Sequence, residues 1–394
     1  MRRIDGGAAT FVPNETSDGS EESDMMSPVF GREALRIGIL ASPWVPVPPV
    51  GYGGTESVVG RLARGLQGAG HDVRLWTTGD STCPVPRGFA YPTARTEEMG
   101  TSSIELRHTL EGYEWFGDEG CDVIHDHTLV GPFLATATAP VITTNHGPFD
   151  NPELATIFSR LPRAIPIIAI SRNQASVAPG LGIHVAHVIH HGIDIDEVPE
   201  GDGRGDAHGP YLLFLGRMNP AKGVVQAIEV ARATGHRLLV AARMREAAEL
   251  AFYDDVVAPR CTDGIEYIGE VGGAEKERLI GGAMALLSPI QWPEPFGLVM
   301  IEALAAGTPV ISTPRGAAPE IIVHGRTGFL CDDTDTLERA VRSIERIDRR
   351  DCRSDVALRF SVDRMVGRHV AAYRGLLAVS GNDRHAPVER LSLV

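Results

Sequence analysis

The chain has 394 residues, which is more than a single hydrophobic core usually organises, so we expect two domains. Apolar residues make up 43% of it, as in ordinary globular proteins. The net charge of −14 disfavours nucleic acid or an anionic membrane as the main partner, because both reward clustered lysine and arginine, but it leaves room for a local basic pocket that binds one small anion.

The cysteines are scattered along the chain and odd in number, and no two of them form a C-x-x-C motif. This pattern predicts reduced thiols and neither a disulfide framework nor a zinc site. No apolar run approaches the ~18 residues that a bilayer span needs, and the first residues lack the apolar stretch of a signal peptide. We therefore expect a cytoplasmic protein without a transmembrane segment. The cysteines are Cys83, Cys121, Cys261, Cys331 and Cys352.

Residues 1–34 contain acidic side chains among Gly, Ser and Thr without an apolar period, which predicts a disordered acidic tail. From Leu35 on, short apolar strands alternate with helical patterns, the first of which opens at Gly53 and ends near Gly70. This alternation predicts a Rossmann-like N-terminal domain over residues 35–197. Its expected strands are 35–41, 72–78, 122–127, 140–146, 166–171 and 187–191.

Residues 198–210 are rich in Gly and Asp and indicate a linker, after which the alternation restarts and predicts a second Rossmann-like domain over 211–360. A helical period runs from Lys222 to Gly235. The expected strands are 211–217, 237–243, 265–269, 284–289 and 308–312. We expect a helix over 361–380 to cross back toward the first half and residues 381–394 to form a loose tail.

The expected fold class is therefore α/β, with two doubly wound Rossmann-like domains that face a central cleft. In such folds the loops and helix N-termini at the carboxyl ends of the strands form the ligand site. The residues that follow these strands are the first candidates for binding and chemistry.

The richest stretch is WPEPFGLVMIEALAAGTPVIS, residues 292–312, in which seven residues separate Glu294 from Glu302. Pro295 suits the first position of a helix, which would place the two carboxylates roughly 12 Å apart along its axis. That separation is too long for a carboxylate pair of the glycosidase type and suits an elongated ligand. The amides of Phe296, Gly297 and Leu298 would then face an anion. The alternative is a pair of solvated helix glutamates.

Two cations, Arg217 and Lys222, flank the turn between the strand 211–217 and the next helix. In this position they would stabilise a diphosphate as a leaving group, although ordinary helix-surface charges would look the same. In the first half, Gly53 and Gly54 form a turn that would let the backbone approach a phosphate or sugar closely. The chain lacks both G-x-G-x-x-G and the Walker lysine, so nicotinamide and ATPase sites are not supported.

Histidines gather in the first half. His125 and His127 would share one strand face while Asp126 points to the other, which argues against a metal site. His146 ends a strand before Gly147, where it would meet a substrate in the cleft, the alternative being a hydrogen-bonded core histidine.

Taken in order, these motifs resemble the large family 4 of retaining glycosyltransferases, which has the two-domain GT-B fold. The resemblance covers roughly residues 35–380, and among family members the chain is most similar to bacterial ones that carry YGGTE and often use UDP-sugars. The motifs are GGTE (53–56), TTNHG (143–147), HHGID (190–194), GRMNPAKG (216–223), IGEV (268–271) and EPFGLVMIEALAAGTPV (294–310).

The resemblance implies a role for each matching residue. Glu294 would hold hydroxyls of the donor sugar, and Glu302 those of the ribose. Arg217 and Lys222 would neutralise the diphosphate, and His146 would lie near the transferred sugar. His146, Arg217, Lys222 and Glu294 are thus the expected catalytic residues. The remaining donor contacts would be the backbone at Gly53, Gly54, Phe296, Gly297 and Leu298, and a base site at Ile268, Gly269 and Val271.

The expected activity is transfer of a hexosyl group, glucosyl by preference, from a UDP-sugar to an acceptor with retention of configuration. The first domain would bind the acceptor and the second the donor, with no metal and no cofactor beyond this nucleotide-sugar co-substrate. The alternatives are a nucleotide-sugar binding or regulatory protein without turnover, and a GT-B epimerase or phosphorylase. The acceptor and the oligomeric state stay open.

Overall fold

The computed structural model describes residues 34–51, 53–134 and 138–383. The described residues from Leu35 on form one compact unit. Nearly all of the predicted acidic tail and most of the predicted C-terminal tail lie outside the described residues.

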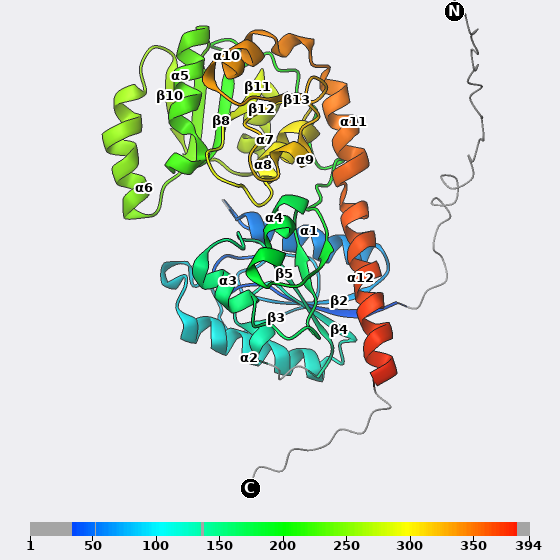
Figure 1. Cartoon of the computed structure of the whole chain (residues 1–394). Coiled ribbons are helices and arrows are strands. Elements are labelled where there is room, and N and C mark those ends of the chain that lie inside the picture. Colours follow the sequence, from blue (N-terminus) through cyan, green and yellow to red (C-terminus); the bar gives the residue numbers. More distant parts are fainter. Residues whose placement is uncertain (1–33, 52, 135–137, 384–394) are drawn as a thin grey trace, which may run out of the picture. The chain divides into compact units, whose positions relative to one another are not determined.

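Within the described part of the first half, the strands form a seven-stranded, fully parallel sheet in the order β3-β2-β1-β4-β5-β6-β7. Figure 1 shows β2, β3, β4 and β5 of this sheet. The order reverses between β1 and β4, which is the topological switch point of a doubly wound fold. The strands are β1 (Arg36–Leu40), β2 (Asp72–Thr77), β3 (Arg87–Phe89), β4 (Val123–Asp126), β5 (Val141–Asn145), β6 (Ile167–Ala169) and β7 (Val185–Val188).

The first helix, α1 (Gly54–Gly68), buries the apolar face that its sequence predicts, including Val59, Leu62 and Leu66. It ends two residues before Gly70, whose left-handed φ of 89° is the conformation that closes many helices. The other described α-helices of this half are α2 (Ser102–Asp118), α3 (Pro152–Phe158) and α4 (Arg172–Val177).

The described strands of the second half form a six-stranded parallel sheet in the order β10-β9-β8-β11-β12-β13. They are β8 (Leu212–Arg217), β9 (Leu238–Arg243), β10 (Ile265–Gly269), β11 (Ala285–Ser288), β12 (Val310–Ser312) and β13 (Gly328–Leu330). Each half thus repeats the same parallel architecture, which confirms the predicted fold class of two Rossmann-like domains.

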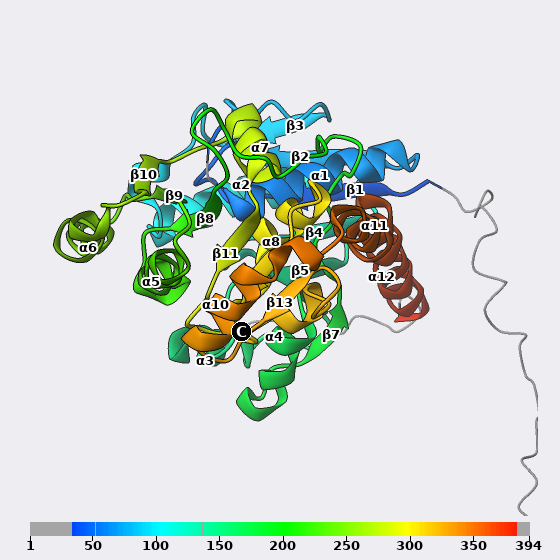
Figure 2. The ribbon, with the colours of Figure 1, turned by 90° about the horizontal axis from the view of Figure 1, so that it is seen from above.

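Helices cover both faces of this second sheet (Figure 2). On one side α5 contacts α10, and on the other α8 contacts α7, α9 and α11. The helices are α5 (Val224–Thr234), α6 (Ala247–Phe252), α7 (Gly273–Gly282), α8 (Leu298–Ala305), α9 (Ala318–Ile321), α10 (Thr334–Arg342) and α11 (Arg349–Phe360).

The two strands that sequence analysis did not predict, β3 and β13, are both short edge strands of three residues. β6 and β12 are equally short, but they are fully buried and lie in apolar runs that the sequence shows, whereas β3 (RGF) and β13 (GFL) each contain a glycine and are only partly buried, so pairing with a neighbouring strand defines them. The strand predicted at 187–191 is also shifted, since β7 ends at Val188 and leaves His190 and His191 beyond the strand.

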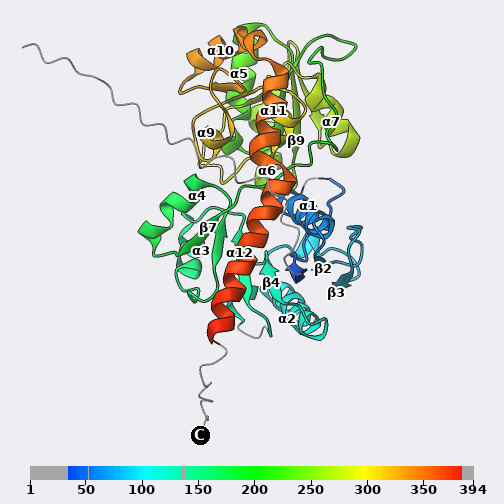
Figure 3. The same ribbon diagram turned by 90° about the vertical axis from the view of Figure 1, so that its right-hand side faces the viewer.

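The last helix, α12 (Val362–Asp383), follows α11 after a break at Ser361, whose ψ of 152° is extended. Figure 3 shows α12 running on from α11 past α1. α12 packs on the first half, where Met365, Val366 and Tyr373 are buried in the core beside α1. Among the helices of the described residues, none has the length and apolar content that a membrane span requires.

Candidate functional site

Lys222 and Glu294 form an ion pair beyond the carboxyl edge of the second sheet. Trp292 Nε1 donates to the same Glu294 oxygen at 2.9 Å, and the Lys222 ammonium lies 5.0 Å from the centroid of the Trp292 ring. The sequence predicted that Lys222 begins an α-helix, and this is wrong. Lys222 closes a 3₁₀ turn that starts at Pro220. The reason is Gly223, whose left-handed φ of 80° separates this turn from α5.

Close backbone packing fixes both partners of this pair. A Cβ at Gly223 would lie 1.9 Å from the Pro289 carbonyl oxygen, so the turn after Lys222 packs directly on the segment that follows β11. A Cβ at Gly316 would lie 2.2 Å from the Glu294 nitrogen, and Ala317 N donates to Glu294 O at 2.9 Å. The positions of Lys222 and Glu294 are therefore set by the backbone as well as by their charges.

The helix after Glu294 begins later than predicted. α8 starts at Leu298, and Gly297 precedes it with a left-handed φ of 96°, so Pro295 is not the first helical residue. Glu294 therefore lies in the loop before the helix, and the separation calculated along a common axis does not apply. The predicted anion site at its N-terminus keeps its physical basis, because the first N–H groups of an α-helix have no partner within the helix.

Glu302, one turn into α8, is a paired and largely buried carboxylate, so the alternative of a solvated glutamate is wrong. Its Oε1 accepts from Lys276 Nζ at 3.0 Å and from Arg61 Nη2 at 3.3 Å, and 12% of its side chain is exposed. Burial by itself would raise the pKa of Glu302, but Lys276 and Arg61 outweigh it and the pKa is lowered. Arg61 belongs to α1 and Lys276 to α7, so this contact joins the two halves.

Arg217, the last residue of β8, is held by two carboxylates of the α6 segment. Its Nε donates to Glu249 Oε1 at 2.7 Å, and its Nη2 forms an ion pair with Glu246. The two predicted diphosphate cations thus have different carboxylate partners, Glu294 for Lys222 and the α6 pair for Arg217.

The glycine-rich turn before α1 lies against the second half of the chain. A Cβ at Gly54 would lie 3.3 Å from Leu298 Cδ1, and one at Gly272 would lie 3.2 Å from the Val50 carbonyl oxygen. Gly53 is required locally, because a Cβ there would lie 2.7 Å from Pro49 Cβ. The structure therefore brings the N-terminal ends of α1 and α8 together, as the predicted donor site requires.

The predicted base site lies at the end of β10. Gly269 has a left-handed φ of 86°, and the pairing of β10 with β9 shifts its register between Tyr267 and Gly269. Ile268 and Val271 are partly buried against the core of the second half. This edge therefore offers an apolar, partly open surface beside an irregular strand end.

His146, which follows β5, is partly buried and lies beside the buried His127 and His191, which follow β4 and β7. His127 Nδ1 lies 2.8 Å from His146 Nε2, and the His146 ring stacks on His191 with centroids 5.2 Å apart. His191 in turn meets Phe296 edge-on at 4.9 Å, which links this group to the segment before α8. Burial lowers the pKa of His146 to about 3, so it is neutral at pH 7.

The remaining ring nitrogens of this pair, His127 Nε2 and His146 Nδ1, are buried without a hydrogen-bond partner. The rings of His125 and His127 lie 4.0 Å apart, whereas Asp126 accepts from Tyr113 Oη at 2.6 Å, which confirms that the histidines share one face and Asp126 faces the other. In the part of the chain that the structure describes, no three His, Cys, Asp or Glu side chains are grouped as metal ligands.

Two family models match the chain in succession. The model described as Glycosyltransferase Family 4 matches residues 52–197, and the one described as Glycosyl transferases group 1 matches residues 204–355. Together they span both Rossmann-like halves. The chain belongs to these GT-B glycosyltransferases.

Similar proteins include the glycogen synthase of Mycobacterium tuberculosis, 28% identical over 348 residues, an alignment that covers 75% of this chain and 83% of the relative. A phosphatidyl-myo-inositol mannosyltransferase of Mycolicibacterium smegmatis is 26% identical over 345 residues, an alignment that covers 79% of this chain and 84% of the relative. The crystal structure of HepE from Anabaena in complex with UDP-glucose superposes with a TM-score of 0.68 at 15% identity, covering 86% of this chain and all of that one, which supports the fold.

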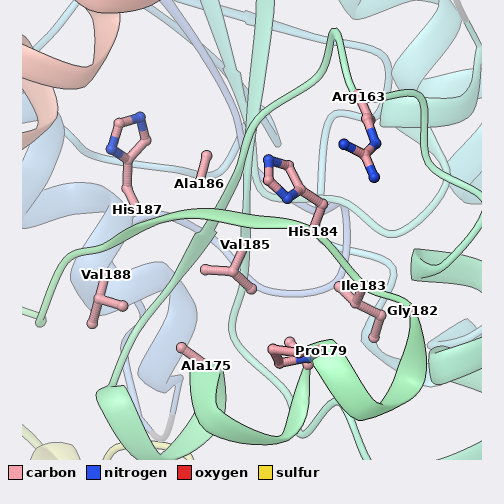
Figure 4. Close-up of a pocket in the computed structure, with 11 residues that line it drawn as sticks. Arg163, Ala175, Pro179, Gly182, Ile183, His184, Val185, Ala186, His187 and Val188 are labelled. Atoms are coloured by element: carbon pink, nitrogen blue, oxygen red, sulfur yellow. The ribbon is translucent and has the colours of Figure 1, made fainter.

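The glycosyltransferase also has a cavity of about 440 Å³ away from these residues (Figure 4). It lies beside the edge strand β7 and α4, and its polar side chains include Arg163, His184 and His187. None of the predicted site residues lines it. We therefore place the candidate site by its chemistry, at the Lys222–Glu294 pair and the start of α8.

Several residues that contact the predicted site of this glycosyltransferase stand outside its sequence motifs. Lys276, Glu246 and Glu249 stand in charged helical segments, where single charges are normally solvated, and Arg61 stands on a helix face of mixed character. Their contacts span 26 to 241 residues of chain, so no local pattern signals them. Trp292 begins the stretch 292–312 that the sequence singled out. This aromatic residue two positions before Glu294 was the one feature of the sequence that could have indicated this contact.

Proposed function

We propose that this glycosyltransferase transfers a glucosyl group from UDP-glucose to an acceptor hydroxyl and retains the anomeric configuration. The observation that carries the proposal is the Lys222–Glu294 pair, fixed next to the start of α8 and with Gly54 against Leu298. A cation, a carboxylate and two helix N-termini at one place suit the diphosphate and the sugar hydroxyls of such a donor.

The preference for UDP-glucose rests on the relatives. One relative is a glycogen synthase, and a protein of the same fold was crystallised with UDP-glucose. A mannosyltransferase among the relatives makes a mannosyl donor the main competitor.

In the proposed complex, the diphosphate lies between Arg217, Lys222 and the amides of Phe296, Gly297 and Leu298, where the chain enters α8. As the glycosidic bond breaks, the departing diphosphate gains negative charge, and fixed cations and N–H dipoles stabilise that charge most when water is excluded. Gly53 and Gly54 would approach it from the other half. These groups replace a metal ion in our proposal.

Glu294 is proposed to hold hydroxyls of the transferred sugar, and Glu302 those of the ribose. The lowered pKa of Glu302 keeps it ionised and able to accept hydrogen bonds at neutral pH. The base would lie at Ile268, Gly269 and Val271. The first half would bind the acceptor.

His146 is proposed to contact the transferred sugar as a hydrogen-bonding group. Because its pKa of about 3 keeps the imidazole neutral, it is not a proton donor at pH 7 in the manner of an imidazolium. Its Nε2 already meets His127 Nδ1, so His146 Nδ1, which has no partner in the described residues, is the nitrogen left for a sugar hydroxyl.

The test is to incubate the purified full chain with UDP-glucose or GDP-mannose and to measure nucleoside diphosphate release with and without candidate acceptors. Release of UDP, with an α-linked product by proton NMR of the fresh reaction, is the expected result. A β-linked product would remove the retaining assignment, and tight binding without release would indicate a binding or regulatory protein. Release from GDP-mannose alone would replace the proposed donor.

A further inference from the structure

Arg217 lies between two carboxylates that differ sharply in their surroundings. Glu249, on α6, accepts from Arg217 Nε at 2.7 Å and has 2% of its side chain exposed. Glu246, the residue before α6, pairs with Arg217 Nη2 and has 63% of its side chain exposed. One cation is therefore held from within the protein by one carboxylate and from the solvent side by another.

The inner carboxylate is itself fixed by the backbone. Glu249 Oε2 accepts from the backbone N–H groups of Arg245 at 3.0 Å and Glu246 at 3.2 Å, which leaves Oε1 for Arg217. Burial by itself would raise the pKa of Glu249, but these N–H groups and Arg217 outweigh it and the pKa is lowered. Glu249 is thus an ionised anchor that joins the start of α6 to the end of β8.

We infer that Glu249 is a positioning residue that orients the guanidinium of Arg217 toward the diphosphate of the donor, whereas Glu246 occupies part of the phosphate position until the donor binds. The inference rests on the proposed function, because it takes Arg217 as a diphosphate ligand. It assigns separate roles to two glutamates that lie three residues apart.

The physical basis is the difference in burial. An ion pair with an exposed carboxylate contributes little net stability, and a diphosphate, with more charge and more acceptor oxygens, replaces it readily. Removing a buried partner is costly, because the other charge is left without compensation in a medium of low polarity. The donor should therefore displace Glu246 and leave the bond between Arg217 and Glu249 intact.

The experiment compares Glu249→Gln with its matched control, Glu246→Gln. Glutamine at 249 keeps one oxygen for the backbone N–H groups and loses the charge that faces Arg217. We expect Glu249→Gln to lower kcat/KM for UDP-glucose about ten-fold or more, with weaker UDP binding by calorimetry, as for loss of a charge-assisted hydrogen bond. Glu246→Gln should leave donor KM within about two-fold of the wild type or lower it.

The same substitution in an Arg217→Lys background separates positioning from general stability. If Glu249 acts through Arg217, Glu249→Gln adds less than about two-fold to the loss already caused by Arg217→Lys. An equal fold-loss in both backgrounds, or equal effects of Glu249→Gln and Glu246→Gln, would overturn the inference. If Glu249→Gln does not fold, Glu246→Gln is compared with Arg217→Ala. An equal rise of donor KM in these two variants would by itself overturn the inference.

Failure of the proposed donor gives a different result. If the wild type binds ADP or GDP instead of UDP, the donor nucleotide is corrected and the variants are compared with that nucleotide. If the wild type binds none of the three by calorimetry, both the proposed donor site and this inference are wrong.

Discussion

At the scale of single residues, the site consists of charges that are already paired before any ligand binds. Lys222 meets Glu294, and Glu302 meets Lys276 and Arg61. A substitution at one of them therefore removes a possible ligand contact and also leaves a partner without compensation. Turnover and stability must be measured together to separate the two effects.

Lys222→Ala should slow turnover by about two to three decades, because a fixed cation that stabilises the leaving diphosphate typically accounts for ~3–4 kcal/mol of transition-state stabilisation. Steady-state kinetics with saturating UDP-glucose measure the effect. Lys276→Ala removes a cation whose ion-pair partner, among the described residues, is Glu302. The effect of this substitution should fall mainly on donor KM. Equal losses of kcat in the two variants would contradict the assignment of Lys222.

Glu302→Ala should weaken donor binding more than it lowers kcat, and Glu294→Ala should do the reverse, since ribose contacts change little in the transition state while the sugar ring gains positive charge. Glu302→Ala should also destabilise the fold by about 2 kcal/mol, because it leaves Lys276 and Arg61 without their carboxylate. Kinetics and chemical denaturation test both parts. The exposed Glu275→Ala, in the first turn of α7, is the control.

At the scale of elements, two left-handed glycines bound α5, and the first of them sets the position of Lys222. Gly223 precedes the helix with a φ of 80°, and Gly235 follows it with a φ of 72°. The two glycines differ in the room available for a side chain. A Cβ at Gly223 would lie 1.9 Å from the Pro289 carbonyl oxygen, whereas one at Gly235 would have no atom within 4 Å.

Gly223→Ala should therefore be far more harmful than Gly235→Ala. The Gly235 variant has only the left-handed backbone to overcome, about 1 kcal/mol, while the Gly223 variant must also move the backbone that carries Lys222. We expect a lower melting temperature and at least ten-fold lower kcat for Gly223→Ala than for Gly235→Ala, on the order of one kcal/mol or more in the barrier. Equal melting temperatures would show that the turn tolerates the added carbon.

At the scale of the whole molecule, the buried histidines make stability depend on pH. Burial lowers the pKa of His146 to about 3 and those of His108 and His369 to about 4, and it holds the pKa of His125, His127 and His191 well below 6.5. The unfolded chain binds protons at these rings near pH 6.5, whereas the folded protein does not. Their contribution is therefore complete above pH 6.5 and is lost as the pH falls toward 3.

The free energy of unfolding should accordingly fall between pH 7 and pH 5.5, by up to about 1.4 kcal/mol per pH unit below 6.5 for each such histidine, while Asp126, whose pKa burial raises to about 7, opposes the fall by at most one proton. Urea denaturation at several pH values measures the slope. His369→Gln should reduce the slope by about one proton, and His208→Gln, at an exposed position, should leave it unchanged. A stability that is flat or rises over this range would contradict the burial of these rings.

Catalysis should not require a divalent metal, because Arg217, Lys222 and the helix N-termini are proposed to supply the charge. Excess EDTA should leave UDP release from UDP-glucose nearly unchanged. Activity lost with EDTA and restored by manganese would overturn this part of the mechanism and leave the fold assignment intact.

The sequence by itself determined the parallel α/β architecture, because apolar strands of five or six residues and amphipathic helices such as α1 carry their period locally. It also determined which segments hold the charged residues, since Arg217, Lys222, Glu294 and Glu302 stand in dense, ordered motifs. The edge strand β3 escaped, because its sequence RGF is mostly exposed and carries no apolar run, so it is defined through pairing alone.

The tertiary structure decided how those charges are partnered. Arg61 reaches Glu302 across 241 residues and Glu249 reaches Arg217 across 32, distances at which local periodicity carries no information. It also decided where α8 begins, because the close approach of Gly316 to Glu294 and the left-handed Gly297 keep Glu294 out of the helix that its neighbours favour. Local sequence sets the elements, and long-range packing sets the electrostatic environment of each site residue.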